Sequence, residues 1–424
     1  DEPTRPEPAG LLPVPVTGTV PEALRAQARR LHAHVAARPD LTVPEVALSA
    51  ATTRSATPHR AAAPGGGHRI RGRRRRPSPA SLDPHEESSH ERPPDHTARA
   101  QGGRTMRVLL IGANGYLGRY VADRLLADPA VQLTALGRGD DADVRFDLAT
   151  GSPGALTRFL DAVHPGVVVN CAGTTRGGAR ELTRHNTVAV ATICESLRRS
   201  GCGARLVHLG CASEYGPSQP GSSTAEDAVP RPGGPYGVSK LAATELVLGS
   251  GLDAVVLRVF SPVGPGTPAG SPLGRLAEAM RRAMQSGDNE LKLGGLGVQR
   301  DFVDVRDVAR AVHAASLSAA QGVVNIGTGR AVRLREAAAV LARVAGFGGS
   351  LHELDSPPAR LVIPAPASEG HAVGTPPTAY PYPDGCGTWQ QADVRTARDR
   401  LGWRPRIVLE ESLADIWMEA ACRI

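Results

Sequence analysis

Aromatic residues, paired cysteines and long apolar runs are scarce or absent in this 424-residue sequence. Aromatic side chains make up 3% of it while Gly (48) and Pro (36) are frequent, so we expect one or two globular domains together with unstructured chain. The six cysteines form no Cys-x-x-Cys pair, which excludes a disulfide framework and a structural metal site and indicates a reduced, intracellular protein. No apolar run reaches the roughly 18 residues that cross a bilayer, and no signal segment follows the acidic start. The sequence therefore predicts a cytoplasmic protein that binds neither metal nor membrane.

The positive charge is concentrated in the first quarter of the chain. The formal net charge is +7, and residues 1–105 hold 16 Arg against 11 Asp and Glu, so most of the excess lies there. The rest of the chain is nearly neutral. A protein that binds nucleic acid carries its basic excess on a folded face, and we therefore predict no nucleic-acid partner.

Residues 1–105 form a leader of distinct composition. Its second half is Gly, Pro, Arg, Ser and His with almost no large apolar residue, and such a segment cannot offset the entropy lost on ordering. Residues 21–63 resemble the linker that follows the ketosynthase in modular polyketide synthases, without a catalytic motif of those enzymes. Because Met106 directly precedes an ideal first strand, we expect residues 1–105 to be a disordered, non-native leader and the working protein to begin at Met106.

From Met106 onward, short apolar segments alternate with helical ones. The apolar segments lie at 107–113, 131–137, 144–148, 166–172, 204–210, 253–259 and 322–327. They are continuously apolar, which indicates strands buried on both faces. Alternation at this spacing predicts an α/β fold with a Rossmann-type doubly wound parallel sheet. We assign residues 106–260 to this core, which returns at about 300–330, and residues 261–299 and 331–424 to a smaller C-terminal substrate-binding lobe.

Three glycines, Gly112, Gly115 and Gly118, mark the turn from the first strand into the first helix. Without Cβ atoms the backbone can turn tightly and approach a pyrophosphate, whose charge meets free N–H groups and the positive end of the helix. Their position between a buried strand and an amphipathic helix favours a dinucleotide site. The alternative is a purely structural turn.

The residues after the second and third strands bear on the choice of cofactor. An acidic residue after the second strand binds the ribose 2′-hydroxyl of NAD(H), whereas an arginine suits the 2′-phosphate of NADP(H). Arg138 comes first here and favours NADP(H); Asp140 or Asp141 reaching back to the ribose of NAD(H) is the alternative. Asp147 is placed either to accept a hydrogen bond from the adenine amino group or to cap a helix.

Tyr236 and Lys240 stand four residues apart and therefore on one face of a helix. A lysine ammonium beside a phenol favours the phenolate, draws the phenol pKa from about 10 toward neutrality, and can hydrogen-bond the nicotinamide ribose. The chain holds one other lysine, Lys292, because arginine supplies its other basic side chains. The pair predicts proton transfer, with a surface pair as the alternative.

Several linked motifs occur in a fixed order. They are Gly-x-x-Gly-x-x-Gly at 112–118, Tyr-x-x-x-Lys at 236–240, RVFSPVGPG at 258–266, RDFVDVRDVARA at 300–311, NIGTG at 325–329 and LGWRP at 401–405. This set resembles the extended short-chain dehydrogenase/reductase family, the NAD-dependent epimerases, dehydratases and reductases of nucleotide sugars. The resemblance runs from Met106 to about Trp417 and is greatest to reductases of nucleotide-linked 4-keto-6-deoxyhexoses.

The resemblance assigns further residues to the two ligands. For the cofactor it implies the glycine turn with Asn114, Tyr116, Leu117, Leu148, Cys171, Ala172, Gly173 and Lys240. For the substrate it implies Arg300, Ser261 and Asn186, with Arg300 binding the diphosphate. A structural salt bridge from Arg300 to Asp304 or Asp307 is the alternative. The family also implies a homodimer through the long helices.

The chain departs from the family at the residue that orients the substrate oxygen. The family has Ser or Thr four residues before the tyrosine of a Tyr-Gly pair, and here that place, counted back from Tyr215, holds Cys211, whose thiol is a weak donor. Either Cys211 acts, or Ser213 turns in, or neither does. The dehydratases also have an acidic pair directly after that residue. Ala212 and Ser213 stand there in this chain, so 4,6-dehydration is not expected.

Together these features predict an NADPH-dependent ketoreductase that acts on a nucleotide-linked 4-keto-6-deoxyhexose. Tyr236 would deliver the proton, Lys240 would lower the pKa of the Tyr236 phenol, and Ser213 or Cys211 would orient the substrate oxygen. The polyketide-like leader suggests deoxysugar biosynthesis in a macrolide-type antibiotic pathway. The alternatives are a nucleotide-sugar epimerase with a permanently held cofactor, a reductase that acts directly on a polyketide ketone, and a non-catalytic NADP-binding sensor.

Overall fold

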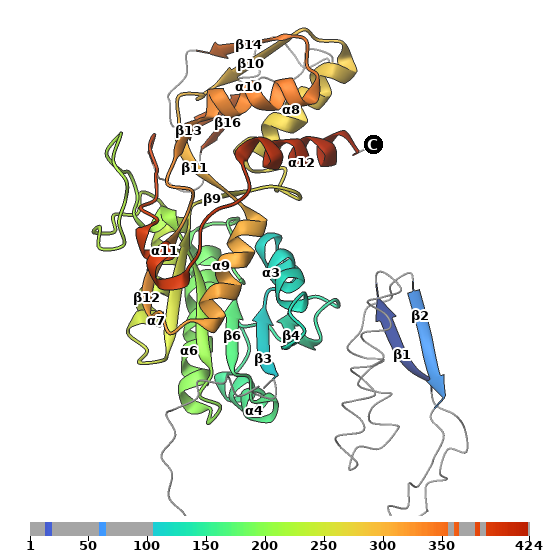
Figure 1. Ribbon diagram of the computed structural model, residues 1–424, viewed down its shortest axis with the longest axis vertical. Helices are drawn as coiled ribbons and strands as arrows, with labels where there is room; N and C mark the ends of the chain where they lie inside the picture. Colours follow the sequence, from blue (N-terminus) through green and yellow to red (C-terminus); the bar gives the residue numbers. More distant parts are fainter. Residues whose placement is uncertain are drawn as a thin grey trace, which may run out of the picture. The chain divides into compact units, whose positions relative to one another are not determined.

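The computed structural model divides the chain into two units, Asp1–Arg104 and Thr105–Ile424. It describes residues 13–18, 59–64, 105–354, 360–363, 378–381 and 387–422. In the first unit, strands β1 (Pro13–Gly18) and β2 (His59–Pro64) pair antiparallel (Figure 1). The rest of the predicted leader, with most of the polyketide-like segment 21–63, lies outside the described residues, so the leader hypothesis stays a prediction.

A parallel sheet forms the centre of the second unit. In the part of the chain that the structure describes, its seven strands follow the order β12-β8-β7-β6-β3-β4-β5. The strands are β3 (Met106–Ile111), β4 (Val131–Gly137), β5 (Val144–Arg145), β6 (Val167–Asn170), β7 (Arg205–Cys211), β8 (Ala254–Val259) and β12 (Gly322–Ile326). The chain order reverses between β3 and β6, so the sheet is doubly wound and the predicted fold class is confirmed.

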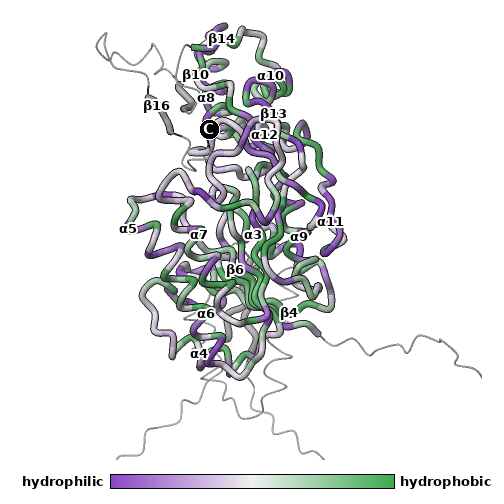
Figure 2. Tube along the Cα trace, turned by 90° about the vertical axis from the view of Figure 1, so that its left-hand side faces the viewer, coloured by the Kyte–Doolittle hydropathy of each residue, from purple (hydrophilic) through white to green (hydrophobic). Residues whose placement is uncertain are grey.

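Helices cover both faces of this sheet. They are α3 (Tyr116–Leu126), α4 (Pro153–Val163), α5 (Ala179–Leu182), the π-helix η1 (Thr183–Val188), α6 (Ala189–Arg199), α7 (Pro235–Leu248) and α9 (Val305–Leu317). Alternate residues of a strand serve opposite faces. In β3, Val108 and Leu110 belong to the core shared with α3 and α9, and Leu109 and Ile111 to the core shared with α4, α6 and α7. Burial on both faces explains the continuous apolar strands, which stand out as the hydrophobic centre of the molecule in Figure 2.

A smaller lobe leaves the sheet at the carboxyl ends of β8 and β12 (Figure 1). Its strands are β9 (Ser261–Val263), β10 (Glu290–Gly294), β11 (Gln299–Asp304), β13 (Ala331–Arg333), β14 (Ser350–Leu354), β15 (Arg360–Ile363) and β16 (Thr378–Pro381). Its helices are α8 (Pro272–Ser286), α10 (Leu334–Ala345) and α12 (Leu409–Ala421). The three helices share one apolar core with β10 and β11, separate from the cores of the sheet.

One segment of the predicted lobe packs on the sheet. Ala397 of α11 (Arg395–Leu401) and Trp403 belong to the core that α9 shares with the strands, and Trp403 Nε1 donates a hydrogen bond of 2.9 Å to the carbonyl of Asp307. The chain therefore returns to the sheet unit after residue 390 before α12 completes the lobe. Among the described residues, no helix is both long and apolar enough to cross a membrane.

Candidate active site

The glycine turn is built around two close backbone approaches. Gly112 has φ +80°, a left-handed conformation, and a Cβ there would lie 2.8 Å from the backbone N of Ala172. A Cβ on Gly118, in the first turns of α3, would overlap the carbonyl oxygen of Gly112. Both positions need glycine because the turn lies against α3 on one side and against the segment after β6 on the other.

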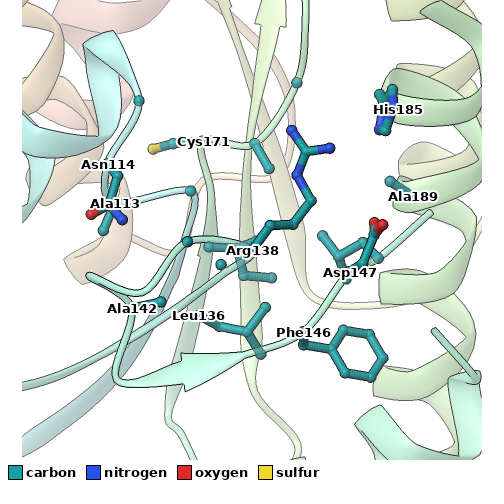
Figure 3. A pocket seen from close by; sticks show the side chains of 18 of the residues that line it. Ala113, Asn114, Leu136, Arg138, Ala142, Phe146, Asp147, Cys171, His185 and Ala189 are labelled. Carbon is teal, nitrogen blue, oxygen red and sulfur yellow. The ribbon is translucent and has the colours of Figure 1, made fainter. Parts of the chain in front are cut away.

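A cavity of about 380 Å³ opens beside this turn, a size suited to part of a nucleotide. It lies at the carboxyl ends of β3, β4 and β6, where the strand order reverses and doubly wound sheets bind ligands. The predicted cofactor residues that line it are Gly112, Asn114, Gly115, Arg138, Asp147, Leu148, Cys171, Ala172 and Gly173 (Figure 3). The fold thus gathers segments that lie far apart in the sequence around one cavity.

Four predicted cofactor residues do not line the cavity: Lys240, described below, and three residues at the start of α3. The Tyr116 hydroxyl lies 3.0 Å from Thr267 Oγ1 in the loop after β9, and burial raises the pKa of this phenol. Leu117 packs against the core of the sheet, and Gly118 serves the close approach to the turn. In the structure these three residues fix α3 in place.

Arg138 follows β4, and its side chain extends into the middle of the cavity (Figure 3). The two acidic alternatives differ in position. Asp140 forms a 2.7 Å ion pair with Arg145 on the surface, whereas Asp141 lines the cavity. A guanidinium can bind a phosphate through two parallel hydrogen bonds, so the cavity offers one cation suited to phosphate and one carboxylate suited to a ribose hydroxyl.

Asp147 caps a turn, and its contact with the adenine amino group stays a prediction. It lines the cavity, and its Oδ1 accepts a hydrogen bond of 3.0 Å from the backbone N of Ala149, which caps the turn before α4. Burial acts to raise the pKa of this carboxyl, but hydrogen bonds from Ala149 and Thr150 and the charge of Arg138 hold the pKa below its usual range. The ionised carboxylate can accept a hydrogen bond inside the cavity.

Other residues that line the cavity were missed from the sequence. They are Ile111, Ala113, Leu136, Gly137, Gly139, Ala142, Phe146, Ala149, Thr174, His185 and Ala189. Most adjoin a predicted residue, and extending each strand end by a few positions would have found them. His185 comes from the π-helix η1, which hydrophobic periodicity does not reveal.

Helix α7 carries Tyr236 and Lys240 and brings Lys240 to the end of β7. Lys240 is 6% exposed, and its Nζ donates a hydrogen bond of 2.6 Å to the carbonyl of Leu209. Burial lowers the pKa of this ammonium, and the negative charge of Glu214 opposes the shift. Burial raises the pKa of the Cys171 thiol and the charge of Lys240 opposes this shift, which indicates that Lys240 lies near the cavity that Cys171 lines. Because Lys240 is inside the protein, the alternative of a surface pair does not apply.

Cys211 and Ser213 lie side by side but differ in exposure. Cys211 ends β7 and is half-buried, whereas Ser213 is 1% exposed in the 3₁₀-helix η2 (Ala212–Glu214). Burial raises the pKa of the Cys211 thiol, and the charge of Lys240 opposes the shift. The Ser213 hydroxyl is buried and has no hydrogen-bond partner among the described residues.

Asn186, predicted to contact substrate, is 1% exposed and occupied by protein partners. Its amide accepts from the backbone N of Thr174 at 2.8 Å and donates to the carbonyl of Thr174 at 2.9 Å and to Ser239 Oγ at 3.0 Å. These bonds join the loop after β6 to α7. Asn186 therefore positions two walls of the site and does not line the cavity.

Ser261 and Arg300 lie on neighbouring strands of the smaller lobe, β9 and β11. Ser261 is half-buried. Arg300 is 3% exposed and donates a hydrogen bond of 2.8 Å to the carbonyl of Gly387. The structure thus brings both residues to the sheet that joins the lobe to the core.

The carboxylates considered as alternative partners of Arg300 bind other arginines. Asp304 pairs with Arg306 Nε at 2.9 Å, and Asp307 accepts from Arg310 Nε at 3.1 Å. Both pairs lie at the start of α9 and fix that helix.

A glycine turn that faces a cavity at the switch point of such a sheet defines a dinucleotide-binding α/β protein. Within this class the chain belongs to the NAD dependent epimerase/dehydratase family, whose model matches residues 108–327. The resemblance drawn from the motifs is confirmed, and with it the prediction of an enzyme of the extended short-chain dehydrogenase/reductase type.

Three similar proteins match this chain over nearly their full length. The dTDP-6-deoxy-L-talose 4-dehydrogenase (NAD(P)(+)) of Kitasatospora kifunensis is 36% identical over 338 residues, 76% of this chain and 96% of that protein. The GDP-6-deoxy-D-mannose reductase of Pseudomonas aeruginosa is 27% identical over 339 residues, 76% and 99% of the two chains. The structure of MoeE5 in complex with UDP-glucuronic acid and NAD is 28% identical, with a TM-score of 0.59 over 74% of this chain and 99% of that chain.

A shorter similarity is of a different kind. A stretch of 61 residues, 14% of this chain, is 51% identical to Polyketide synthase GfsA of Streptomyces halstedii, of which it covers 1%. This agrees with the resemblance of residues 21–63 to a polyketide synthase linker.

Proposed function

We propose that the chain is an NADPH-dependent ketoreductase of a nucleotide-linked 4-keto-6-deoxyhexose. The observation that carries this proposal is the buried Lys240, held to the carbonyl of Leu209 next to the cavity and one helical turn after Tyr236. Two relatives support the substrate class, since one is named a dTDP-6-deoxy-L-talose 4-dehydrogenase (NAD(P)(+)) and the other a GDP-6-deoxy-D-mannose reductase.

The cavity suits the adenosine and pyrophosphate part of the cofactor. Gly112 and Gly118 bring backbone close on one side, Arg138 offers a cation for a phosphate, and Asp147 offers an acceptor. NADPH, when bound, supplies the hydride that turns the keto carbon into a carbinol carbon. The residues of the chain then have to hold the sugar, orient its carbonyl and deliver a proton to the oxygen.

Tyr236 delivers that proton in this proposal. Its hydroxyl is a general acid whose phenolate must be stabilised once the proton has left. The ammonium of Lys240 does this because the two side chains share one face of α7 and the hydrogen bond to Leu209 fixes Nζ. The half-buried Cys211 is the donor that orients the carbonyl, since the Ser213 side chain is almost fully buried.

Replacing Cys211 with Ser should raise the turnover number about fivefold, because a hydroxyl donates a hydrogen bond that is stronger by roughly 1 kcal/mol. Initial rates of NADPH oxidation at saturating substrate measure this. Ser213→Ala is the matched control and should leave the rate unchanged. A slower Cys211→Ser variant, or a large loss in Ser213→Ala, would assign the role to Ser213.

Replacing Arg138 with Ser should weaken NADPH binding about 10- to 100-fold and leave NADH binding unchanged, because charge-assisted bonds to the 2′-phosphate are lost. Equilibrium titration of each cofactor, followed by nicotinamide fluorescence, measures the ratio. Arg145→Ser is the control, since Arg145 pairs with Asp140 on the surface and does not line the cavity. Equal losses for both cofactors would contradict the NADP(H) preference and favour binding of the ribose by Asp141.

Dehydration is not part of the proposal. The one carboxyl group in η2, Glu214, is fully buried and hydrogen-bonded to Arg258 and Thr244. It cannot protonate a departing hydroxyl while it is held there. This supports a reductase over a 4,6-dehydratase.

The decisive test is NADPH consumption by the purified full-length protein. A fall in NADPH absorbance with a dTDP- or GDP-linked 4-keto-6-deoxyhexose, matched by a reduced sugar in the product, supports the proposal. Nucleotide that co-purifies, with sugar isomerised and no net NADPH consumed, would indicate an epimerase. No reaction with any such sugar overturns the proposal.

The proposal also covers the biosynthetic pathway and the oligomeric state. The similarity to a polyketide synthase supports a role in deoxysugar biosynthesis for a macrolide-type antibiotic. We also propose a homodimer, as the family resemblance implies.

A further inference from the structure

A buried acidic group that the proposed mechanism does not use lies beneath the active site. Glu214 is fully buried in η2. Its Oε1 accepts from the backbone N of Cys211 at 2.7 Å, and its Oε2 accepts from Thr244 Oγ1 at 2.9 Å and from Arg258 Nε at 2.7 Å. One carboxylate thus joins the end of β7 to α7 and to β8.

Gly210 allows this carboxylate to lie flat on the strand. A Cβ on Gly210 would come within 2.8 Å of Glu214 Oε1. Of the two residues that flank this glycine, one accepts a hydrogen bond and the other donates one. The carbonyl of Leu209 accepts from Lys240 Nζ at 2.6 Å, and the N–H of Cys211 donates to Glu214. Lys240 and Glu214 therefore hold the same short stretch of β7 from two sides.

Several charged and titratable groups lie around Lys240. They are Tyr236 on α7 itself, His208 and Cys211 on β7, Glu214 on η2 and Cys171 after β6, with Arg258 of β8 paired to Glu214. Burial lowers the pKa of both Lys240 and His208, so His208 is neutral. The thiols of Cys171 and Cys211 have raised pKa values and are neutral too. Glu214 is the carboxylate of this set.

We propose that Glu214 is a positioning residue for the active site: together with Lys240 it holds the two peptide groups that flank Gly210, and its hydrogen bonds keep Cys211 and α7 in register. The inference rests on the proposed function, because it gives Lys240 and Cys211 their roles in ketone reduction. Arg258 anchors the carboxylate, and its guanidinium in turn lies 4.5 Å over the ring of Tyr215. The charge of Glu214 acts on Lys240, and the bonds of Glu214 act on the backbone.

The presence of only two lysines makes this inference directly testable. In protein labelled with ¹⁵N or ¹³C on lysine side chains, NMR gives signals from Lys240 and Lys292 alone, and a Lys292→Arg sample assigns them. Titration of wild-type protein, Glu214→Gln and Glu214→Asp then reports the ionisation of Lys240. Asp307→Asn is the matched control, because Asp307 is also fully buried and paired with an arginine, Arg310, but belongs to α9.

Glu214→Gln should move the titration of Lys240 to lower pH, since the negative charge that favours the ammonium is gone. The alkaline limb of kcat/KM for ketone reduction should move the same way. Glu214→Asp keeps the charge and should retain the wild-type titration while lowering kcat, because its shorter side chain no longer holds Cys211 in the same place. Asp307→Asn should change neither pH dependence, whatever it does to stability.

Two outcomes overturn the inference: an unmoved Lys240 titration in Glu214→Gln, or an equal shift in Asp307→Asn. If Glu214→Gln does not fold because Arg258 is left unpaired, the double variant Glu214→Gln/Arg258→Gln removes both charges and is titrated instead. The double variant is compared with Arg258→Gln, which keeps the carboxylate, and equal Lys240 titrations in these two variants overturn the inference as well. The NMR titration needs no substrate, so a shift without any sugar reduction would defeat the proposed substrate and leave the role of Glu214 standing.

Discussion

Replacing Tyr236 with Phe should lower the turnover number about 10³-fold, within the range that loss of a general acid produces, with affinity for NADPH largely kept. The substitution removes one oxygen from a half-buried side chain and leaves the ring in place. Lys240 keeps its bond to the carbonyl of Leu209, so the site retains its charge and its shape. Single-turnover rates with pre-bound NADPH measure the chemical step.

A second tyrosine provides the matched control. Tyr120→Phe removes a hydroxyl that donates a 2.7 Å hydrogen bond to the carbonyl of Pro265, away from the cavity. Its turnover should equal that of the wild type. If Tyr236→Phe were as active as Tyr120→Phe, proton delivery by Tyr236 would be wrong and a non-catalytic cofactor sensor would become the better interpretation.

Replacing Gly118 with Ala should destabilise the protein by about 3 kcal/mol, the upper end of what overpacking costs. The new Cβ would overlap the carbonyl oxygen of Gly112, and backbone cannot move aside as a side chain can. Either α3 shifts away or the turn that lines the cavity opens, so NADPH affinity should fall as well. Thermal unfolding should show a melting temperature roughly 4–5 °C lower for a unit of this size.

Gly154→Ala tests whether the loss is specific. Gly154 lies in the first turn of α4, and the nearest atom to its Cβ would be Ser152 Oγ at 3.5 Å, an ordinary contact. Alanine favours helix, so this variant should be equal to the wild type or up to about 1 kcal/mol more stable. A Gly118→Ala protein that melts like Gly154→Ala and binds NADPH normally would contradict the packing argument.

The sheet and the glycine turn were predictable because their signals are local. Each strand is a short apolar run, and burial on both faces leaves no alternation to interpret. The left-handed φ of Gly112 and the spacing of Tyr236 and Lys240 on one helix follow from neighbouring residues. Motifs of this kind identified the family before any contact was known.

The sequence predicted the smaller lobe only as the part of the chain left over once the sheet had been assigned. Strand β10 pairs with β14 across the whole of β11, α9, β12 and α10, and no local pattern encodes such a pairing. The return of Trp403 to the core of the sheet was missed for the same reason. Which helices cover which residues depends on the closure of long loops.

Some residues of the candidate site were predictable from the sequence and others were not. Arg138 and Asp147 were found at strand ends, where a parallel sheet gathers its ligand residues. His185 was missed because it comes from a π-helix, and Glu214 because a single acidic residue next to a Tyr-Gly pair has no signal of its own. Its role exists only through its contacts with Cys211 and Arg258, which the chain brings together from separate strands.

The amino-acid order alone therefore determined the class of fold, the dinucleotide turn and the Tyr236–Lys240 pair, since each depends on residues within a few positions of one another. Only the tertiary structure decided that Cys211 rather than Ser213 is accessible, that Asp147 is held ionised, and that Lys240 is buried opposite a carboxylate. Exposure, dielectric surroundings and distance between charges are properties of the packed chain. They arise when segments remote in sequence exclude water together.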